Sequence, residues 1–366
     1  MIPIYKPYFT ETNLKYAHDA INSGWVSSQG EYLDIVKNKL KEFLNCKKLI
    51  LTNNGTTATH LVALALKYKY PHIKKIIVPN NVYVAAWNSF LFDKEYELVP
   101  IDADLDTWNF DLNKLESVID ENSAVLIVHN IGNVIDVPML KNKFPNTIFI
   151  EDNCEGFLGK YGDKYTGTDS FASSISFFGN KTLTSGEGGA FITNDCDVFE
   201  YINKIKSQGQ SNEKFVHDVL GYNYRMTNVQ AAILLGQLEC IDEIKEKKHR
   251  IFEQYKSIFE NEKSISLQKI ENGTTHSEWM FGMRFNNFTE KQKKDLELHL
   301  FKMGIDTRPM FYDITQHNHL SHIVCTTTNA RFLQSQCLIL PSYPELTNSQ
   351  IMFICDKIKK FLKNKV

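Results

Sequence analysis

The segment with the most specific chemical pattern is FFGNKTLTSGEGGAF, residues 177–191. A hydrophobic run leads into a turn, presents Lys181, and continues through Gly186, Gly188 and Gly189 into a second hydrophobic run. A lysine on a tight loop between strands can form a Schiff base with an aldehyde cofactor, and glycines let the backbone approach closely. Taken alone this pattern is weak, because most lysines are solvated surface charges.

A second candidate is Asp152, which directly follows the hydrophobic run TIFIE. In open parallel sheets, ligands bind at the carboxyl ends of the strands. A carboxylate beside the pyridine nitrogen of pyridoxal phosphate (PLP) keeps that nitrogen protonated, so that the ring accepts electrons. The alternative is that Asp152 only caps the turn that follows the strand.

The segment NNGTT has the composition of an anion site, because Gly55, Thr56 and Thr57 stand between an expected strand and an expected helix. Free backbone N–H groups and the positive end of a helix attract phosphate there, and the threonine hydroxyls add donors. Ser176, five residues before the lysine, supplies another hydroxyl. An ordinary helix cap is the alternative for this segment.

Tyr83, in VPNNVYVAAW, follows another expected strand. Its aromatic face is suited to covering a pyridine ring bound at the same edge of the sheet. Packing in the core is the more common role of a single tyrosine.

The segment QHNHLSH carries His317, His319 and His322, at spacings of two and three. Neither a nearby cysteine nor an HExxH pattern accompanies them, so the pattern is a weak indication of a metal site. We therefore expect no metal.

Six short runs rich in Ile, Val, Leu and Phe predict strands at 48–52, 75–78, 124–128, 147–151, 175–178 and 190–193. Several are nearly continuous in apolar residues, as is typical of strands covered on both faces. Helical stretches such as 56–67 and 112–119 lie between them. This alternation predicts an α/β fold, with a mostly parallel sheet flanked by helices, whose strand ends carry the candidate residues.

The pattern changes near residue 228, where apolar residues at three- and four-residue spacing predict one long helix over 228–260. After it we expect, in order, a strand at 279–285, a helix at 289–303, a strand near 307–311 and two closing helices. The last of these begins at TNSQ, which has capping-box spacing. The chain is thus predicted to form a large α/β domain, 1–235, and a smaller α+β domain, 236–366, that begins within the long helix.

The composition is that of an ordinary globular protein, with 41 basic and 43 acidic residues and a net charge of -2. No block of like charges suggests a nucleic-acid partner. The seven cysteines are scattered without a CxxC pair, which indicates reduced thiols. The N-terminus does not resemble a signal peptide, and no apolar run is long enough to cross a membrane. We expect a soluble, cytoplasmic protein without membrane association.

Taken in order, these segments resemble the DegT/DnrJ/StrS family of nucleotide-sugar aminotransferases over nearly the whole chain. Landmarks of the resemblance are IPIYKPYF, SGWVSSQGEY, NNGTTATHLVAL, VPNNVYVAAWN, IEDNCEGFLGKYGDKYTGT, SFFGNKTLTSGEGGAF, GYNYRMTNVQAAI and TRPMFY. The segments SFFGNK and GEGG, together with GYNYRMTNVQAA at their separation, are the most specific part of the match.

The resemblance implies fold type I of the PLP-dependent enzymes and a homodimer whose two active sites lie at the subunit interface. By motif position, Lys181 would carry PLP, Asp152 would pair with the pyridine nitrogen, and Tyr83 would stack on the ring. The cofactor phosphate would be held by Gly55, Thr56, Thr57, Ser176 and, from the neighbouring subunit, Asn223. A bridge across the turn before the long helix is the alternative for that asparagine.

The resemblance also suggests substrate contacts. Arg225 and Arg308 are expected at a phosphate or carboxylate, because guanidinium forks suit such oxygens, although structural ion pairs are an equal alternative. Trp25, Ser27 and Ser28 match the family's N-terminal loop, which lies near the sugar. Each of these five assignments rests on motif position.

By the same resemblance, Glu155 would stand beside the cofactor, at a position where many family members have Gln or His. An acid is also found there in sugar 4-aminotransferases that this chain resembles. The departure therefore bears on the identity of the substrate and leaves the use of PLP untouched.

The implied reaction is PLP-dependent transfer of an amino group from L-glutamate to C4 of a nucleotide-linked 4-keto-6-deoxy sugar, most similar to enzymes that use GDP-linked sugars. The product would be an amino sugar for glycan or O-antigen synthesis. Alternatives are a dTDP- or UDP-linked sugar, amination at C3, and a catalytically idle PLP-binding regulator. The family's dehydratase branch has His at the lysine position, so the presence of Lys181 argues against it.

Overall fold

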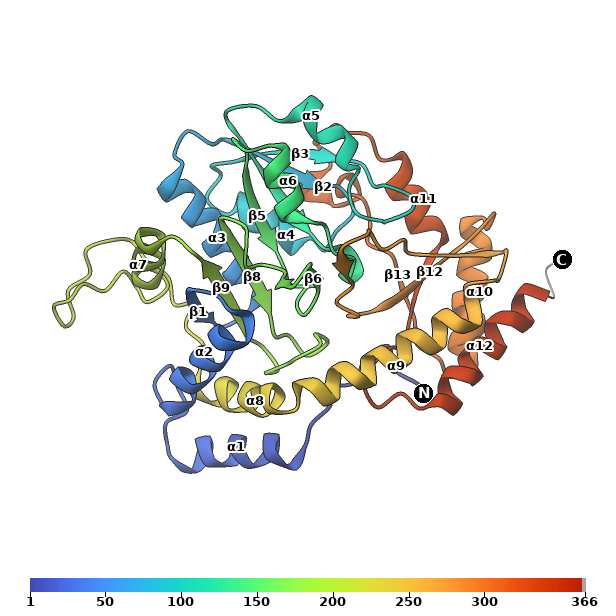
Figure 1. Cartoon of the computed structure of the whole chain (residues 1–366), viewed down its shortest axis with the longest axis horizontal. Helices are drawn as coiled ribbons and strands as arrows, with labels where there is room; N and C mark the ends of the chain where they lie inside the picture. Colours follow the sequence, from blue (N-terminus) through green and yellow to red (C-terminus); the bar gives the residue numbers. More distant parts are fainter. Residues whose placement is uncertain (364–366) are drawn as a thin grey trace.

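The computed structural model describes residues 1–363, and a seven-stranded sheet forms the centre of the larger part of the fold (Figure 1). The strand order is β1-β9-β8-β5-β4-β2-β3. The strands are β1 (Lys48–Thr52), β2 (Lys75–Pro79), β3 (Glu97–Ile101), β4 (Ser123–Val128), β5 (Ile148–Asp152), β8 (Ala172–Ser176) and β9 (Gly189–Thr193). Only β9 runs antiparallel to its neighbours in this sheet, so the predicted mostly parallel sheet is confirmed.

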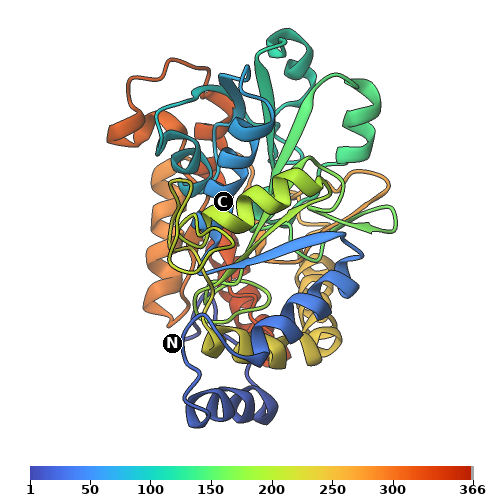
Figure 2. The same ribbon diagram turned by 90° about the vertical axis from the view of Figure 1, so that its left-hand side faces the viewer.

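Helices cover both faces of this sheet. On one face, α3 (Gly55–Lys69), α4 (Ala85–Leu91) and α7 (Cys196–Ile205) pack on every second strand residue, and Figure 2 shows α7 crossing that face. On the other face lie α2 (Glu31–Leu44), α5 (Leu115–Val118), α6 (Val137–Lys143) and α8 (Asn228–Glu239). Successive side chains of a strand point to opposite faces of the sheet. Because both faces are covered, the strands are nearly continuous in apolar residues.

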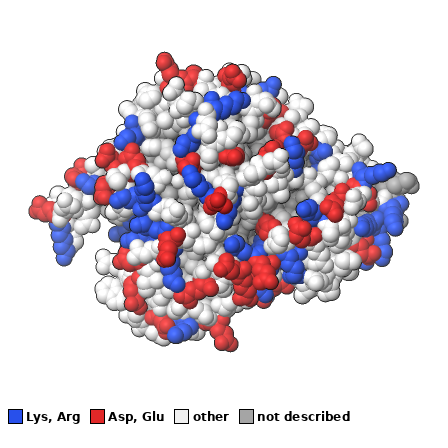
Figure 3. All heavy atoms as spheres, viewed as in Figure 1, with Lys and Arg blue, Asp and Glu red and all other residues white. Residues whose placement is uncertain are grey.

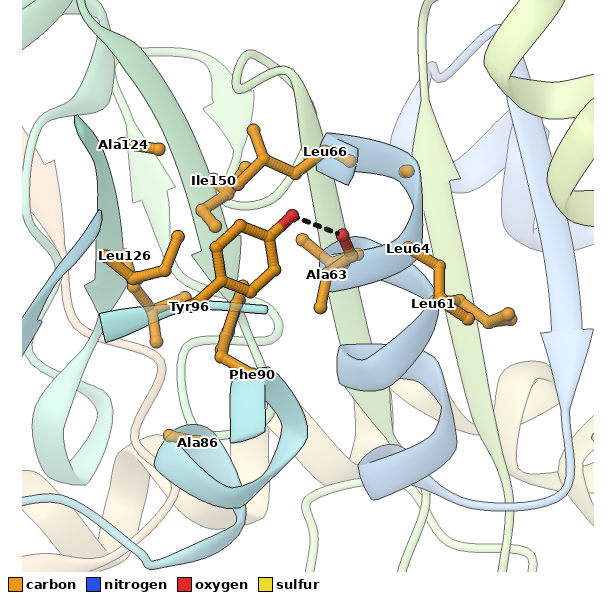
Figure 4. Close-up of a cluster of buried hydrophobic side chains, with 14 of the residues drawn as sticks. Leu61, Ala63, Leu64, Leu66, Ala86, Phe90, Tyr96, Ala124, Leu126 and Ile150 are labelled. Carbon is orange, nitrogen blue, oxygen red and sulfur yellow. Dashed lines mark hydrogen bonds between the residues drawn. The ribbon is translucent and has the colours of Figure 1, made fainter. Parts of the chain in front are cut away.

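Tyr96 illustrates how a polar group is accommodated in the core of the first face (Figure 4). Its ring packs among side chains that include Phe90 and Ile150. Its hydroxyl donates a hydrogen bond of 3.0 Å to the carbonyl oxygen of Ala63 in α3. The bond satisfies a hydroxyl whose burial without a partner would cost free energy.

A second, four-stranded sheet has the order β10-β12-β14-β13. Its strands are β10 (Ile265–Leu267), β12 (Phe281–Phe285), β13 (Arg308–Pro309) and β14 (Cys337–Leu340). They share a core with α9 (Ile241–Phe259), α10 (Glu290–Lys302) and α12 (Asn348–Lys363), while α11 (Thr328–Gln336) packs beside them. A small sheet joins β6 (Lys160–Tyr161), β7 (Lys164–Tyr165) and β11 (Thr274–Thr275).

The predicted single helix over 228–260 is wrong in one respect, because it is divided at Cys240. Cys240 has φ −110° and ψ 20°, and α8 and α9 meet there nearly end to end (Figure 1). The division of the chain at residue 235 stays a prediction.

Two strands differ from the sequence prediction. The strand expected at 175–178 is β8, which begins at Ala172 and ends at Ser176. Its first half is not predicted because Ser173 and Ser174 are polar, although both are buried. Strand β3 was not predicted, since it contains Pro100 and lies at the sheet edge, where proline is tolerated.

The remaining elements are short or N-terminal. They are α1 (Glu11–Asn22) and the 3-10 turns η1 (Leu112–Lys114), η2 (Asn130–Gly132), η3 (Ile314–Gln316) and η4 (Asn318–Leu320). The predicted capping box of α12 is confirmed by reciprocal bonds between Thr347 and Gln350.

The described residues include no helix with the length and apolar character needed to cross a membrane. All seven cysteines are free thiols. Basic and acidic side chains are interspersed over the face drawn in Figure 3.

Candidate active site

Lys181 lies on the loop that joins β8 to β9. Both ends of this loop are closed by backbone bonds, from Phe177 N to Gly188 O at 2.8 Å and from Ser185 N to Phe177 O at 3.0 Å. Lys181 N donates to Phe178 O at 2.9 Å, which makes a tight turn at the lysine. These backbone hydrogen bonds therefore fix the shape of the loop that carries Lys181.

Two aromatic residues from distant parts of the chain hold this turn. The Trp279 indole N–H donates to Asn180 O at 2.9 Å, and the Tyr5 hydroxyl donates to Lys181 O at 2.8 Å. The amine of Lys181 lies 3.9 Å from the centre of the Trp279 ring. A cation over an indole face is attracted by the ring quadrupole, so Trp279 contacts both the backbone and the charge of this segment.

Asp152 is the last residue of β5 and is buried. Its Oδ1 accepts a hydrogen bond of 3.1 Å from the backbone N of Cys154. Strand β5 pairs with β8, so the carboxyl end that bears Asp152 lies beside the end of the strand leading to Lys181. The expected position at a strand end is thus confirmed, while a contact with the pyridine nitrogen stays a prediction.

Glu155 is buried in the turn after β5, and its pKa is affected by the charges of Lys181 and Asp152. Burial raises the pKa of Glu155 to about 7, the nearby Lys181 amine lowers the pKa, and Asp152 raises it. Its Oε2 accepts a hydrogen bond of 2.8 Å from Ile131 N, in the HNIG turn. Since the charges of Lys181 and Asp152 both shift the pKa of this carboxyl group, and β5 pairs with β8, we treat the three side chains as one cluster.

The N-terminus of α3 adjoins this cluster. A Cβ added to Gly55 would lie 2.6 Å from Ser176 Cβ and 3.2 Å from Cys154 Sγ, so only glycine permits this approach. Within the described residues, the backbone N–H groups of Gly55 and Thr56 and the hydroxyl of Thr56 donate no hydrogen bond to the protein. The Ser176 hydroxyl accepts from Phe178 N, which leaves its proton available.

Thr57 differs from its neighbours. Its backbone N–H donates to the capping Asn54 side chain at 2.9 Å, and its hydroxyl donates to Asn53 Oδ1 at 2.7 Å. Both of its donors are therefore used inside the protein. The predicted phosphate contact of Thr57 stays a prediction, with less donor capacity than Gly55, Thr56 or Ser176 retains.

This set of side chains fits the cofactor that the resemblance implies. PLP needs an amine for its aldehyde, a carboxylate for its pyridine nitrogen and hydrogen-bond donors for its phosphate. Lys181, Asp152 and the unused donors at the start of α3 supply these three chemistries around Glu155 and Cys154. The residues present therefore match the group.

Tyr83 precedes α4, and its side chain is 61% exposed. Its ring centre lies 6.2 Å from that of Phe311, three residues after Arg308. The face of Tyr83 is thus available to a ligand, and its stacking role stays a prediction.

Asn223 and Arg225 lie together, with Arg225 Nε donating to Asn223 Oδ1 at 3.0 Å. The backbone of Arg225 also forms an isolated antiparallel β-bridge with Thr52. Asn53 N donates to Tyr224 O at 3.1 Å, next to the start of α3. The backbone of this segment therefore runs next to the predicted phosphate site of its own chain. The contribution of Asn223 and Arg225 to a neighbouring subunit stays a prediction.

The other predicted substrate residues lie apart from these contacts. Arg308 is exposed and forms an ion pair with Asp306. An ion pair of this kind was the alternative to a substrate contact for this arginine. Trp25, Ser27 and Ser28 lie on the loop between α1 and α2, with Trp25 58% exposed. Their substrate roles stay predictions.

Two of the three histidines of QHNHLSH, His317 and His319, contact residues of α4. His319 Nε2 lies 2.7 Å from Asn88 Oδ1, and the ring of His317 packs on Trp87. Among residues 1–363, no group of three or more His, Cys, Asp and Glu side chains is arranged to hold a metal.

Several residues of the site were not found from the sequence. Trp279 and Tyr5 contact the lysine turn, and Cys154 lies between Asp152 and Glu155. Neither aromatic residue lies near the turn in the chain, so no local pattern identifies it. The available signals were the presence of Tyr5 inside the landmark IPIYKPYF and of Cys154 inside IEDNCEGFLGKYGDKYTGT.

Replacing Glu155 with glutamine is expected to stabilise the cofactor-free protein, and more so as the pH rises. The folded pKa of Glu155, about 7, exceeds the unfolded value near 4.5, so the folded state binds more protons and loses stability between these pH values. E155Q removes this loss, up to about 3 kcal/mol above pH 7, and its amide oxygen still accepts from Ile131 N. Urea unfolding of both proteins at pH 5 and pH 8 measures the difference. A difference that does not change with pH contradicts the prediction.

Comparisons with known proteins agree over the whole chain. A model of the DegT/DnrJ/EryC1/StrS aminotransferase family matches residues 7–359. GDP-perosamine synthase of Escherichia coli O157:H7 is 34% identical over 368 residues, covering 100% of this chain and 99% of that protein. Helicobacter pylori PseC, an aminotransferase involved in the biosynthesis of pseudoaminic acid, superposes with a TM-score of 0.92 at 22% identity, covering 99% of both chains. The PLP form of a putative sugar aminotransferase from Streptococcus pneumoniae gives 0.90 at 19% identity, covering 100% and 99%.

Proposed function

Because the chain belongs to the DegT/DnrJ/EryC1/StrS aminotransferase family, we propose that it transfers the amino group of L-glutamate to C4 of a GDP-linked 4-keto-6-deoxy sugar. The predicted family, the fold of the PLP-dependent aminotransferases and the assignment as a PLP-dependent enzyme are confirmed by the comparisons. The product would be an amino sugar, as in GDP-perosamine synthase, for use in glycan or O-antigen synthesis.

The observation that carries the proposal is the cluster around Glu155. Lys181 and Asp152 come from two different strand ends, and both act on the Glu155 carboxyl. The start of α3, with its unused donors, packs on Ser176 at the end of β8 and on Cys154, which lies between Asp152 and Glu155. An amine, an acid and an anion site at one sheet edge are the parts that amino transfer with PLP requires.

When bound, PLP supplies a conjugated ring that accepts the electron pair from the carbon bearing the amino group. Lys181 would hold it through its amine, and Asp152 would hold the proton of the pyridine nitrogen. Gly55, Thr56 and Ser176 would bind the phosphate with backbone and hydroxyl donors.

When its amine is not bonded to the cofactor, Lys181 would be the residue that carries protons between the reacting carbon atoms. It would take the proton from the amino-bearing carbon of glutamate and, in the second half of a ping-pong cycle, deliver a proton to C4 of the sugar. Trp279 would orient the amine through its ring face, which lies 3.9 Å from Nζ. Glu155, with a pKa of about 7, would be able to hold or lose a proton near neutral pH.

The choice of a GDP-linked acceptor and of C4 follows the similarity to GDP-perosamine synthase. Incubation of the purified protein with PLP, glutamate and GDP-, dTDP- and UDP-linked 4-keto-6-deoxy sugars tests it. Mass spectrometry should detect the conversion of ketone to amine, fastest with the GDP-linked sugar, and NMR should place the amine at C4. A faster reaction with a dTDP- or UDP-linked sugar would overturn the choice of substrate, and no reaction at all would overturn the function.

The proposal includes a homodimer. The segment between α7 and α8 projects from the rest of the fold (Figure 1) and exposes Phe215 by 80% and Leu220 by 87%. Asn223 and Arg225 follow directly, so a second copy that covers these apolar side chains would also approach the phosphate site. Sedimentation velocity should give twice the chain mass of 42.2 kDa, and Phe215→Ser with Leu220→Ser should shift it toward one chain mass. A wild-type monomer at micromolar concentration contradicts the dimer.

A further inference from the structure

The loop between α1 and α2 is held mainly by hydrogen bonds from a distant residue instead of by packing. Its side chains, including Trp25 and Val26, are exposed, so little apolar packing fixes its shape. The N-cap of α2 is Gly30, which has no side chain and makes no capping bond. A loop of this kind needs hydrogen bonds from elsewhere to keep one conformation.

Asn228, the first residue of α8, supplies these bonds. Its Nδ2 donates to Trp25 O at 2.8 Å, and its backbone N donates to Ser27 O at 2.6 Å. Its Oδ1 accepts from Tyr32 N at 3.1 Å, and so caps α2 from a position 196 residues away in the chain. Asn228 itself is only 2% exposed.

Apart from Asn228, no residue outside α1, α2 and the loop forms a hydrogen bond with residues 24–30, within the part of the chain that the structure describes. Gly30 packs directly on the Asn228 side chain, since an added Cβ would lie 2.2 Å from Asn228 Cγ. Gly30 also has φ +143°, a backbone conformation that favours glycine. The fit between Gly30 and Asn228 is therefore specific.

The same helical turn is also bonded to the active site. Gln230 Nε2 donates to Glu187 O at 2.9 Å, on the loop after Lys181, and to Asn53 O at 3.3 Å, just before α3. The first turn of α8 thus fixes the N-terminal loop in relation to the lysine loop and the start of α3.

We propose that Asn228 is a positioning residue for recognition of the nucleotide-linked sugar, because it holds Trp25, Ser27 and Ser28 in the conformation that receives the sugar. The inference rests on the proposed function and on the prediction from motif position that these three residues lie near the sugar. It adds a residue that touches no substrate and acts through the loop.

Asn228→Ala and Asn228→Asp test this inference. Alanine removes both side-chain bonds, while aspartate keeps the volume and the acceptor for Tyr32 N but places an oxygen against Trp25 O. Asn13→Ala is the matched control, because Asn13 is equally buried, donates to Ile233 O and accepts from Thr10 N, without touching the loop.

In both Asn228 variants, KM for the nucleotide sugar should rise roughly tenfold, because the binding-competent loop is populated less often. The kcat and the KM for glutamate should stay within about twofold of wild type, as should all constants of Asn13→Ala. A KM for the sugar that stays within twofold of wild type in both Asn228 variants overturns the inference and leaves the proposed function standing. A matching rise in Asn13→Ala overturns it as well, whereas a wild-type protein that aminates no sugar contradicts the proposed function itself.

Two measurements follow the loop without turnover. Amide hydrogen exchange of residues 24–32 should accelerate in the Asn228 variants and not in Asn13→Ala. Trp25 is the exposed tryptophan, while Trp87, Trp108 and Trp279 are buried, so acrylamide quenching of fluorescence reports mainly on the loop. The GDP-linked sugar should reduce this quenching in wild type and have less effect in the Asn228 variants. Unchanged exchange and unchanged protection in the variants count against the inference.

Discussion

Replacing Lys181 with alanine is expected to lower the rate of amino transfer by at least about 10³-fold, because one side chain supplies both the bond to the cofactor and the proton carrier. Borohydride treatment of the wild-type protein with PLP should fix a pyridoxyl group on the peptide that contains Lys181. The variant should show no such adduct and no visible absorbance of the bound cofactor in its covalent form.

Lys181→Arg is the matched control for this experiment. An arginine keeps a cation that can stack on the Trp279 ring, but its guanidinium does not form the bond to an aldehyde at neutral pH. It should therefore be as inactive as the alanine variant while retaining wild-type stability more closely. A pyridoxyl adduct on another lysine, or turnover within tenfold of wild type in either variant, would falsify the assignment.

Replacing Asp152 with asparagine is expected to lower kcat by about 10²–10³-fold, since the neutral amide does not hold the proton on the pyridine nitrogen. The fold should be retained, because the asparagine oxygen can still accept the hydrogen bond from Cys154 N. Steady-state kinetics with saturating PLP, together with circular dichroism, separates loss of chemistry from loss of structure.

Asp136→Asn provides the comparison for that experiment. Asp136 also accepts a backbone N–H through Oδ1, from Met139 at 2.9 Å at the start of α6, but it is not part of the cluster around Glu155. Its variant should keep wild-type kcat. If Asp152→Asn retains kcat within threefold of wild type, the carboxylate has no role in the electronics of the cofactor.

Trp279 fixes the position of Lys181 through two contacts. The indole is bonded to the backbone next to Lys181 and faces its amine, and it is itself 5% exposed. The turn is also bonded to Tyr5 from the other end of the chain. Contacts within the protein thus orient the lysine, and such preorganisation limits the cost of ordering a site.

Local patterns were enough to locate the main chemistry. Lys181 follows a strand and precedes glycines, Asp152 ends a hydrophobic run, and Gly55 opens a helix, so each was identified from a few neighbouring residues. The mostly parallel sheet was also predictable, because strands buried on both faces are continuous in apolar residues. Prediction failed where the composition contradicted the role, as in the serine-rich β8 and the proline-containing β3.

The sequence alone determined which side chains are chemically suited to hold a cofactor, and roughly where along the chain the strands that carry them lie, because periodicity and turn chemistry act over a few residues. Only the tertiary structure decided that Trp279 and Tyr5 hold the lysine turn and that Asn228 caps α2. The physical reason is that a hydrogen bond between residues about 100 to 200 positions apart depends on how helices and strands pack, and packing leaves no pattern in either local segment.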